Sequence, residues 1–293
     1  MALSLLPLFG LLFAAYPTYA DFSTGALPDL SPPKGRIYLA NLAAMFKAIE
    51  ELPSAKDNRG FLGPAKHQGY CGSCVTFAAH GLLEASIAYR YGLSAPVTLA
   101  EQLTLDCTAG IIPNYCEKGA LGPAILNILV DVGATNSTDD AFRYLPLATK
   151  KYVPQITNCI NLKNSLLGKN EIYPFRPLVW EKLQIGSAND IKILVDAYGA
   201  VMATFNSGKL KSSELWGTDI AEFGDGPDGL HEIVVVGWDD DKQSFLVRNS
   251  WGSSSCHYPH LYPGRLGTGQ HTVFRARFMS FITERNDFRC AKR

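Results

Sequence analysis

Apolar residues recur with a helical period in the first half of the chain and with a strand-like pattern in the second half. After Cys74 they follow a helical period that stops at Gly92, so a helix is predicted to begin at this cysteine. Further helical patterns cover residues 120–132 and 189–198. β-branched and aromatic runs predict strands at residues 201–205, 233–238, 245–247 and 272–282. The pattern therefore predicts an α+β fold, with a helical half followed by a β-rich half.

One more helix is predicted from the segment Thr98-Leu99-Ala100-Glu101. A threonine followed three residues later by a glutamate is the pattern of a capping box, in which each side chain satisfies one unpaired backbone N–H. This helix is expected to continue to about Asp106.

The composition is that of an ordinary globular protein, with 47% hydrophobic and 18% charged residues among 293. The 27 basic and 27 acidic residues balance and form no run of like charge, which argues against a nucleic-acid partner or an anionic membrane surface. We expect a monomer that needs no cofactor and no metal.

The first 20 residues predict a secretory signal peptide. An apolar run over residues 3–15 precedes a polar break and the small residue Ala20, after which cleavage is expected. A membrane anchor is the alternative, but the run is shorter than the roughly 18 apolar residues that a span needs. Residues 21–52 are then expected to be a short propeptide, and the mature chain to be secreted or to reach a lysosomal or vacuolar lumen.

The chain contains an odd number of cysteines, which in an exported protein leaves at least one sulfur outside a disulfide. The seven are Cys71, Cys74, Cys107, Cys116, Cys159, Cys256 and Cys290. Spacing alone does not choose the pairing.

Cys74 is a candidate nucleophile because of its place at a helix start. The unpaired N–H groups and the positive end of the helix dipole favour the thiolate there. The alternatives are a redox CxxC motif with Cys71 or half of a zinc site, but no second CxxC or histidine cluster follows.

Two strand-like segments flank an acidic turn and predict a hairpin centred on Asp240. In that register Ile233 faces Val247 and Glu232 faces Arg248, so an apolar pair and a charge pair agree.

The same register sets His231 opposite Asn249. The amide oxygen of Asn249 can accept the imidazole N–H and orient the ring as a catalytic base requires. The alternative is a hydrogen-bonded pair at a sheet margin that does no chemistry.

Four separate motifs occur in order along the chain. They are Gln68-Gly69-Tyr70-Cys71-Gly72-Ser73-Cys74, Leu99-Ala100-Glu101-Gln102-Leu103 with Asp106-Cys107, His231 with Val234-Val235-Val236-Gly237, and Asn249-Ser250-Trp251-Gly252. Together they resemble the papain and cathepsin cysteine peptidases over about residues 53–252. The resemblance implies a papain-like two-lobed fold, with a helical lobe over about 53–165, an antiparallel β-barrel-like lobe over about 166–293 and a cleft between them. It also implies a peptidase, expected to be an endopeptidase, that acts on peptides or proteins and is open to cystatin-type inhibitors.

The resemblance assigns roles to individual residues. Cys74 becomes the nucleophile, His231 its general base, and Asn249 the residue that orients His231. A side-chain N–H of Gln68 and the backbone N–H of Cys74 become the donors of the oxyanion hole. Trp251 is expected to shield the bond between His231 and Asn249 from water.

The same resemblance implies two disulfides, Cys71–Cys116 and Cys107–Cys159. Cys256 and Cys290 are then left for each other by exclusion.

The sequence also departs from the family pattern. Val75 replaces the aromatic residue that usually follows the nucleophile, and Lys118 alters a stretch in which Gly119 can still hydrogen-bond to substrate. Gly119 and Trp251 are the expected substrate contacts, and Asn136 begins a glycosylation sequon. After Gly252 the resemblance ends.

Three alternatives to a peptidase remain open. One is a catalytically silent binding protein of the same fold, which the departures suggest. The second is a transpeptidase or ligase that uses the same acyl-enzyme. The third is a thiol oxidoreductase through Cys71 and Cys74.

Overall fold

The computed structural model describes residues 26, 51–136, 142–145, 159, 178–184, 187–206, 220–222, 229–252, 260–262 and 272–278. The expected signal peptide, all but a few residues of the expected propeptide, and the pair Cys256 and Cys290 lie outside the described residues.

The helical part of the chain is organised around α2 (Cys74–Tyr91). This helix begins at Cys74 and ends at Gly92, whose φ of 57° is the left-handed conformation that commonly ends a helix. The predicted helix after Cys74 is therefore confirmed. The other helices of this part are η1 (Arg59–Phe61), α3 (Glu101–Ile111), α4 (Tyr115–Lys118) and α5 (Gly122–Val132).

The capping box predicted at Thr98 is not formed. Helix α3 begins later, at Glu101, and has no side-chain hydrogen bond at its cap. The preceding residues form strand β2 (Leu99–Ala100), which pairs with β3 (Thr135–Asn136). The carboxylate of Glu101 binds Lys66 at 2.5 Å instead of turning back to the helix end. The side chain of Glu101 therefore forms a buried ion pair and not the cap that the local pattern predicted.

One large sheet contains most of the strands of the second half. Its order is β4-β10-β5-β7-β8-β9-β6, and β1 pairs with β7 beside this path. The bounds are β1 (Ala55–Asp57), β4 (Leu178–Gln184), β5 (Val201–Asn206), β6 (Ile220–Glu222), β7 (Leu230–Asp239), β8 (Ser244–Arg248), β9 (His260–Tyr262) and β10 (Thr272–Phe278). All pairs are antiparallel except β6 with β9. Within the described residues the sheet is open, because its end strands β4 and β6 do not meet.

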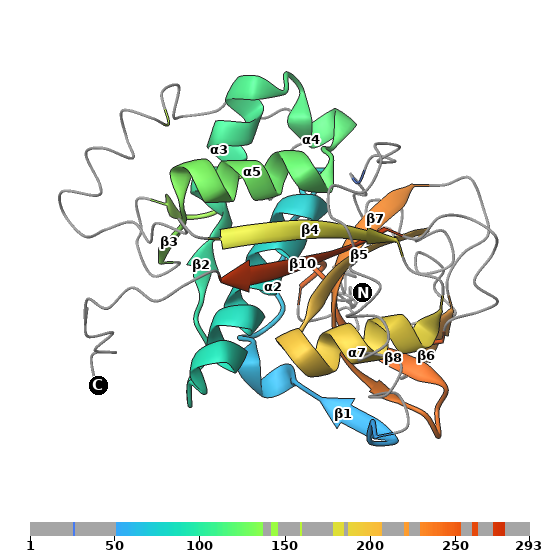
Figure 1. Ribbon diagram of the computed structural model, residues 1–293. Coiled ribbons are helices and arrows are strands. Elements are labelled where there is room, and N and C mark those ends of the chain that lie inside the picture. The colour runs from blue at the N-terminus through green and yellow to red at the C-terminus, as the bar shows by residue number, and fades with distance from the viewer. Residues whose placement is uncertain are drawn as a thin grey trace, which may run out of the picture.

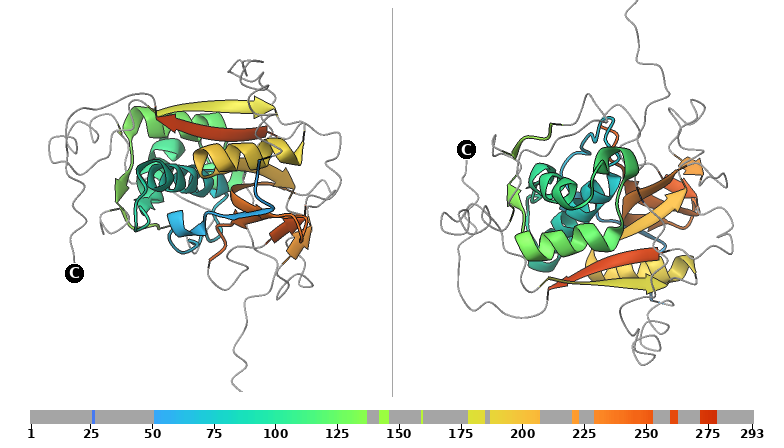
Figure 2. Two further views of the ribbon diagram at one scale, coloured as in Figure 1. Left: turned by 60° about the horizontal axis from the view of Figure 1, so that its bottom comes forward. Right: turned by 90° about the horizontal axis from the view of Figure 1, so that it is seen from above.

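Helices α2 and α7 (Ala188–Tyr198) lie against opposite faces of this sheet, as Figures 1 and 2 show. Alternate residues of β7 point to opposite sides, as in any strand. Val234 and Val236 belong to the core around α2, whereas Ile233 and Val235 belong to the core under α7. A central strand is therefore buried on both faces, and α2 is held directly on it.

The β7–β8 hairpin forms in a register different from the predicted one. Val235 pairs with Val247, and residues 240–243 make the turn. Because the turn is longer than predicted, the residue pairs next to it are shifted from the predicted pairs by an odd number of positions. The bulge between Val235 and Gly237 adds one residue on β7, so the pairs beyond it are shifted by an even number. Because side chains alternate with a period of two, His231 and Asn249 keep the same face although they are no longer directly opposite.

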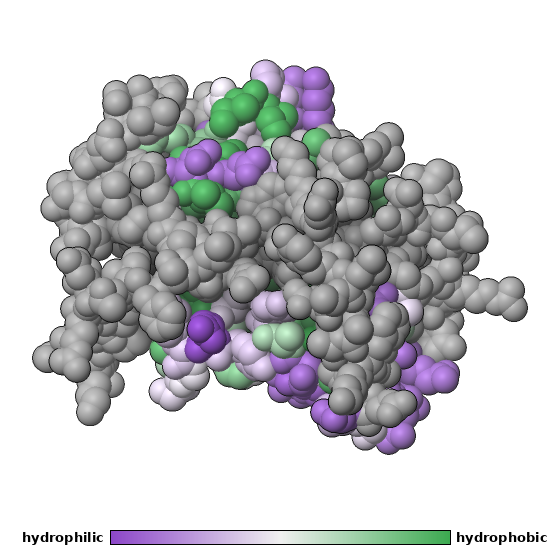
Figure 3. Space-filling view, in the orientation of Figure 1, coloured by the Kyte–Doolittle hydropathy of each residue, from purple (hydrophilic) through white to green (hydrophobic). Residues whose placement is uncertain are grey.

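The surface of the described residues is mixed in character. Figure 3 shows apolar surface at the top of the view, over α3 and α4. Ile111, the last residue of α3, is 70% exposed.

Candidate active site

Cys74 is the first residue of α2, and its side chain is fully buried. Helix starts leave backbone N–H groups without intrahelical partners and carry the positive end of the dipole, so a sulfur there is favoured as thiolate. Among the cysteines that the structure describes, Cys74 is the one outside a disulfide.

Both disulfides implied by the resemblance are present. They are Cys71–Cys116 and Cys107–Cys159. The first ties the loop before α2 to α4, and beside it the N–H of Gly72 donates to the carbonyl of Cys116 at 2.7 Å. Because Cys71 is bonded to Cys116, it cannot also serve as the redox partner of Cys74. The oxidoreductase alternative therefore lacks its dithiol.

His231 is the second residue of β7 and is fully buried. Its Nε2 lies 2.8 Å from Oδ1 of Asn249, and the N–H of Ser250 donates to the same oxygen at 2.7 Å. An amide oxygen only accepts hydrogen bonds, so Nε2 of His231 carries a hydrogen. Nδ1 is then the nitrogen that can take up a proton.

Two aromatic rings enclose His231. The ring of Trp251 stacks on the imidazole with centroids 4.6 Å apart, and the ring of Phe205 meets it edge-on at 5.6 Å. Trp251 is only 4% exposed, so little of its surface faces solvent. In such a dry environment the hydrogen bond between His231 and Asn249 is stronger than it would be in water.

Gln68 is fully buried and bonded to Ser250 through both backbone and side chain. Its N–H donates to the carbonyl of Ser250 at 2.8 Å, and the Ser250 hydroxyl donates to its Oε1 at 2.5 Å. Nε2 of Gln68 donates to the carbonyl of Cys71 at 2.9 Å. An antiparallel bridge between His67 and Trp251 continues the contact. This backbone pairing brings together two motifs that are distant in sequence.

An ionic cluster lies between α2, α3, β8 and the segment before Gln68. The ammonium of Lys66 contacts Glu84 at 2.9 Å and Glu101 at 2.5 Å, and the guanidinium of Arg248 contacts Glu84 at 2.7 Å. Burial alone would raise the pKa of Glu84, but Lys66 and Arg248 outweigh it and hold the pKa at about 2. The charges are mutually compensated, as buried charges must be.

Glu232 follows His231 and faces a different environment. Its Oε2 accepts a hydrogen bond from the Thr204 hydroxyl at 2.6 Å, and its Oε1 has no hydrogen-bond partner among the described residues. Burial raises the pKa of Glu232 to about 8, against the smaller opposing effect of the Thr204 bond. The sequence paired Glu232 with Arg248, but the displaced register puts Val234 opposite Arg248, whose guanidinium binds Glu84.

A small cavity lies beside this carboxyl. Glu232, Arg248, Asn249 and Ser250 are among the residues that line it. The buried side chain of Glu232, which follows the candidate base in the sequence, is thus a neutral acid at acidic and neutral pH.

Residue 26, from the expected propeptide, lies between two segments expected to bind substrate. The N–H of Ala26 donates to the carbonyl of Leu230 at 3.2 Å, and Ala26 forms a parallel bridge with Ala120. These partners directly precede His231 and follow Gly119. Gly119 has a φ of 75°, a conformation that favours glycine.

The remaining expected residues are found at separate places. Val75 is buried in the core around α2, and Lys118 is the last residue of α4. Asn136 is exposed at the end of β3, and the rest of its sequon lies outside the described residues.

The sequence reasoning missed three participants. Glu232 could have been suspected, because it is a charged residue followed directly by the apolar run Ile233-Val234-Val235-Val236. The hydroxyl of Ser250 and the side chain of Tyr144, which bonds to the Gln68 carbonyl, gave no such signal.

The described residues hold no group of three or more His, Cys, Asp or Glu side chains that could bind a metal ion. Within the same residues, no helix has both the length and the apolar character to cross a membrane.

Comparisons with known proteins agree with this geometry. The family model described as "Papain family cysteine protease" matches residues 52–258. The chain is 28% identical over 225 residues to the thiol protease aleurain of Arabidopsis thaliana, a match that covers 73% of this chain and 56% of that protein. It is 29% identical to cysteine proteinase 3 of Solanum lycopersicum, with 75% and 56% covered. The matched region thus spans about half the length of these curated relatives.

Two solved structures share the fold. A digestive procathepsin L 3 of Tenebrio molitor larval midgut superposes with a TM-score of 0.54 at 18% identity, covering 87% of this chain and 73% of that one. A recombinant stem bromelain precursor gives 0.56 at 16% identity, with 88% and 76% covered.

Proposed function

The chain belongs to the papain family of cysteine proteases, and on that basis we propose that it hydrolyses peptide bonds with Cys74 as nucleophile and His231 as general base. One observation carries the proposal. The bond from Nε2 of His231 to Asn249 commits one ring nitrogen as donor, so the other can exchange a proton with a thiol at the start of α2.

The reaction proceeds through an acyl-enzyme. The Cys74 thiolate attacks the peptide carbonyl carbon and forms a C–S bond, while an electron pair moves onto the carbonyl oxygen. The C–N bond then breaks, and the imidazolium of His231 gives its proton to the departing amine. In the second half, His231 takes a proton from water, the water oxygen attacks the thioester, and the thiolate leaves.

The oxyanion formed in each half needs donors. We assign this role to a side-chain N–H of Gln68 and to the backbone N–H of Cys74. Gln68 is suited to it because Ser250 and Cys71 hold its amide in one orientation. Loss of one such donor typically costs about 3 kcal/mol in the transition state.

The propeptide acts by occupying the substrate groove. Ala26 bonds to Leu230 and pairs with Ala120, which are the neighbours of the candidate base and of Gly119. A chain segment held there excludes a substrate backbone from the same hydrogen-bonding groups, so the protein is made as a zymogen.

The protein works in an oxidising compartment, outside the cell or in a lysosomal or vacuolar lumen. The two disulfides favour this assignment, since such bonds persist where thiols are not kept reduced. We propose endopeptidase action on peptides and proteins, with cystatin-type proteins as inhibitors.

Covalent titration tests the assignment. The processed protein is treated with an irreversible epoxide thiol inhibitor at a series of pH values from about 4 to 8, and the modified peptide is identified by mass spectrometry. We expect stoichiometric labelling of Cys74 and none in Cys74→Ala, together with a bell-shaped pH profile of peptide hydrolysis.

The outcomes separate the alternatives. A folded, processed chain that is not labelled is the silent binding protein instead. Labelling together with peptide transfer to an added amine, at the expense of hydrolysis, identifies a transpeptidase.

A further inference from the structure

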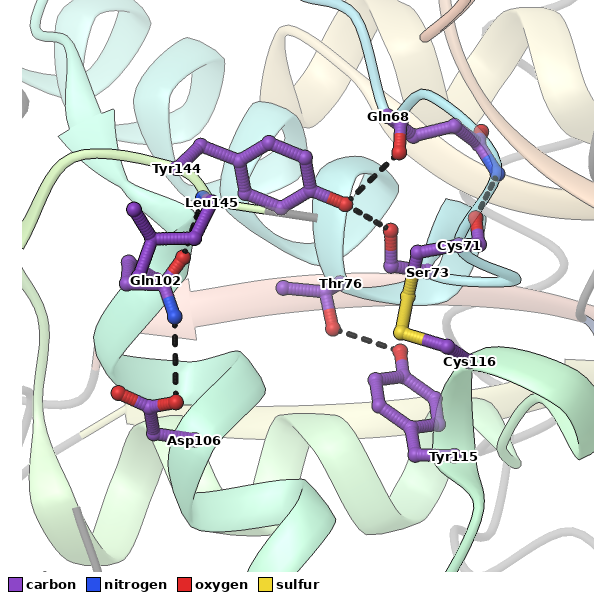
Figure 4. Close-up of a disulfide and its surroundings, with 10 residues drawn as sticks. All are labelled: Gln68, Cys71, Ser73, Thr76, Gln102, Asp106, Tyr115, Cys116, Tyr144 and Leu145. Atoms are coloured by element: carbon purple, nitrogen blue, oxygen red, sulfur yellow. Dashed lines mark hydrogen bonds between the residues drawn. A yellow bond between two sulfur atoms is a disulfide. The ribbon is translucent and has the colours of Figure 1, made fainter. Parts of the chain in front are cut away.

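The hydroxyl of Tyr144 connects the two backbone segments that flank the proposed oxyanion hole. It lies 2.9 Å from the carbonyl oxygen of Gln68 and 2.6 Å from Oγ of Ser73, the residue before Cys74. Figure 4 shows the ring extending from its own loop to both partners. The Tyr144 hydroxyl therefore contacts Gln68, which carries one proposed oxyanion donor. It also contacts Ser73, whose neighbour Cys74 carries the other.

The directions of these two bonds follow from the number of hydrogens. A carbonyl oxygen only accepts, so the single O–H of Tyr144 donates to Gln68. The hydroxyl of Ser73 must then donate to the oxygen of Tyr144. The result is a continuous chain of donors from Ser73 through Tyr144 to Gln68, in which each bond polarises the next.

The position of Tyr144 is itself fixed by the helical part. The N–H of the next residue, Leu145, donates to Oε1 of Gln102 at 2.9 Å, and Nε2 of Gln102 donates to Asp106 at 3.1 Å. The ring of Tyr144 meets the ring of Phe77 edge-on with centroids 4.9 Å apart. Helix α2 thus contacts the ring of Tyr144, and helix α3 holds the backbone that follows it.

The residues Glu101 and Gln102 act in parallel on the same segment. The carboxylate of Glu101 holds Lys66, two residues before Gln68. Its neighbour Gln102 holds the loop of Tyr144, which bonds to Gln68 itself. The start of α3 therefore supports the Gln68 segment at two points.

From this arrangement we infer that Tyr144 is a positioning residue for the oxyanion hole, which sets the distance between Gln68 and the start of α2. The inference rests on the proposed function. Tyr144 itself does not touch the reacting atoms. It acts because an oxyanion donor must be held within a fraction of an ångström, and a misplacement of about 1 Å can cost roughly a hundredfold in rate.

The test removes only the hydroxyl, with Tyr144→Phe. The ring and its contact with Phe77 remain. Three measurements are made on the processed protein: hydrolysis of a fluorogenic peptide amide, inhibition by leupeptin, and alkylation of Cys74 by iodoacetamide. Leupeptin is a peptide aldehyde, whose adduct with the thiol carries an oxygen in the oxyanion hole. Alkylation needs the thiolate but no oxyanion donor.

We expect kcat to fall about tenfold with KM nearly unchanged, and the leupeptin inhibition constant to rise by a similar factor, since both depend on the placed donor. The alkylation rate and its pH profile should stay within about twofold of wild type, because the thiolate is formed as before. Ser73→Ala keeps the bond from Tyr144 to Gln68 and should give a smaller loss of the same pattern.

Tyr115→Phe is the matched control. Tyr115 also bonds through its hydroxyl to α2, at Oγ1 of Thr76 and 2.7 Å away, but does not contact Gln68 (Figure 4). It should lose thermal stability while all three kinetic measurements stay within about twofold of wild type.

Each outcome supports or contradicts the positioning role of Tyr144. If Tyr144→Phe matches wild type, or if the two tyrosine variants lose activity equally, the positioning role is wrong. If Tyr144→Phe does not fold, Ser73→Ala carries the test with the same pattern. A wild-type chain that neither hydrolyses the peptide nor binds leupeptin overturns the proposed function, and the inference with it.

Discussion

Glu84 on α2 and Glu232 on β7 lie on two elements that pack directly against each other, and both carboxyl groups are buried. The region around Glu84 is ionic, with Lys66 and Arg248 in contact with one carboxylate. The side chain of Glu232 accepts one hydrogen bond, from Thr204, and forms no ion pair among the described residues, although Lys66 and Arg248 line the same small cavity. The pKa of Glu84 is held at about 2 and that of Glu232 is raised to about 8.

The difference shows that burial alone does not decide whether a carboxyl is charged. Burial raises the pKa in both regions, and the cations, together with the bond from the Leu99 N–H, reverse the sign for Glu84. The stability of the ionic region therefore depends on the presence of every charged partner, whereas the stability of the neutral region depends on the pH.

The largest expected effect comes from breaking the ionic region with Glu84→Ala. The change leaves Lys66 and Arg248 buried beside each other without their common counter-ion. We expect the free energy of unfolding to fall by about 3–5 kcal/mol, measured by urea denaturation at pH 7. The control is Arg59→Ala, which removes an exposed ion pair with Asp57 and should cost less than about 1 kcal/mol. Equal losses in the two variants would contradict the ionic account.

The second prediction tests the neutral region through its pH dependence. The folded-state pKa of Glu232 lies above its unfolded value of 4.5, so the folded form binds the proton more tightly. Its contribution to stability is fully present below about pH 4.5 and is lost as the pH rises through about 8. We expect the wild type to lose a few kcal/mol between about pH 5 and 9 from this group.

Glu232→Gln should remove that part of the pH dependence, because the amide imitates the neutral carboxyl at every pH. The measurement is the free energy of unfolding of both proteins from about pH 5 to 9. Parallel curves for the two proteins would mean that Glu232 does not titrate in this range. The pH dependence of stability that comes from Glu84 has the opposite sign. Its stabilising effect is lost only as the pH falls from about 4.5 towards 2.

The smallest effect sharpens the comparison by removing the side-chain hydrogen bond that Glu232 makes within the described residues. Thr204→Val should cost about 1 kcal/mol at pH 5, the usual value of a single hydrogen bond, and more at pH 9, where the acceptor is charged. It should also move the loss of stability to higher pH, because the Thr204 bond lowers the pKa of Glu232. Thr108→Val removes a similar buried hydroxyl, bonded to the Thr104 carbonyl, and should cost the same at both pH values.

The elements that the sequence predicted well are those that depend on local chemistry. Helix α2 begins and ends where the apolar period and Gly92 put it, and α7 and the strands β5, β7 and β8 lie at the predicted places within one to three residues. Strand β4 was not predicted, and neither were the short strands β1, β6 and β9.

The two clear errors have different causes. Glu101 pairs with Lys66 and so does not cap its own helix. The β7–β8 hairpin has a longer turn and a bulge, which the pattern of apolar residues does not reveal, because the two displacements together leave the residues beyond the bulge, such as His231, on their expected face. The contact of His231 with Asn249 followed from the right face and not from the right register.

By itself the sequence determined the candidate residues for the proposed chemistry, because the helix start at Cys74 and the motifs around His231 and Asn249 are each formed by neighbouring residues of the chain. Only the tertiary structure decided what surrounds them. The pairing of Gln68 with Ser250, the link through Tyr144 and the opposite states of Glu84 and Glu232 all join segments far apart in sequence. Local propensity carries no information about such contacts, because the free energy of a buried polar group depends on the partners that folding brings to it.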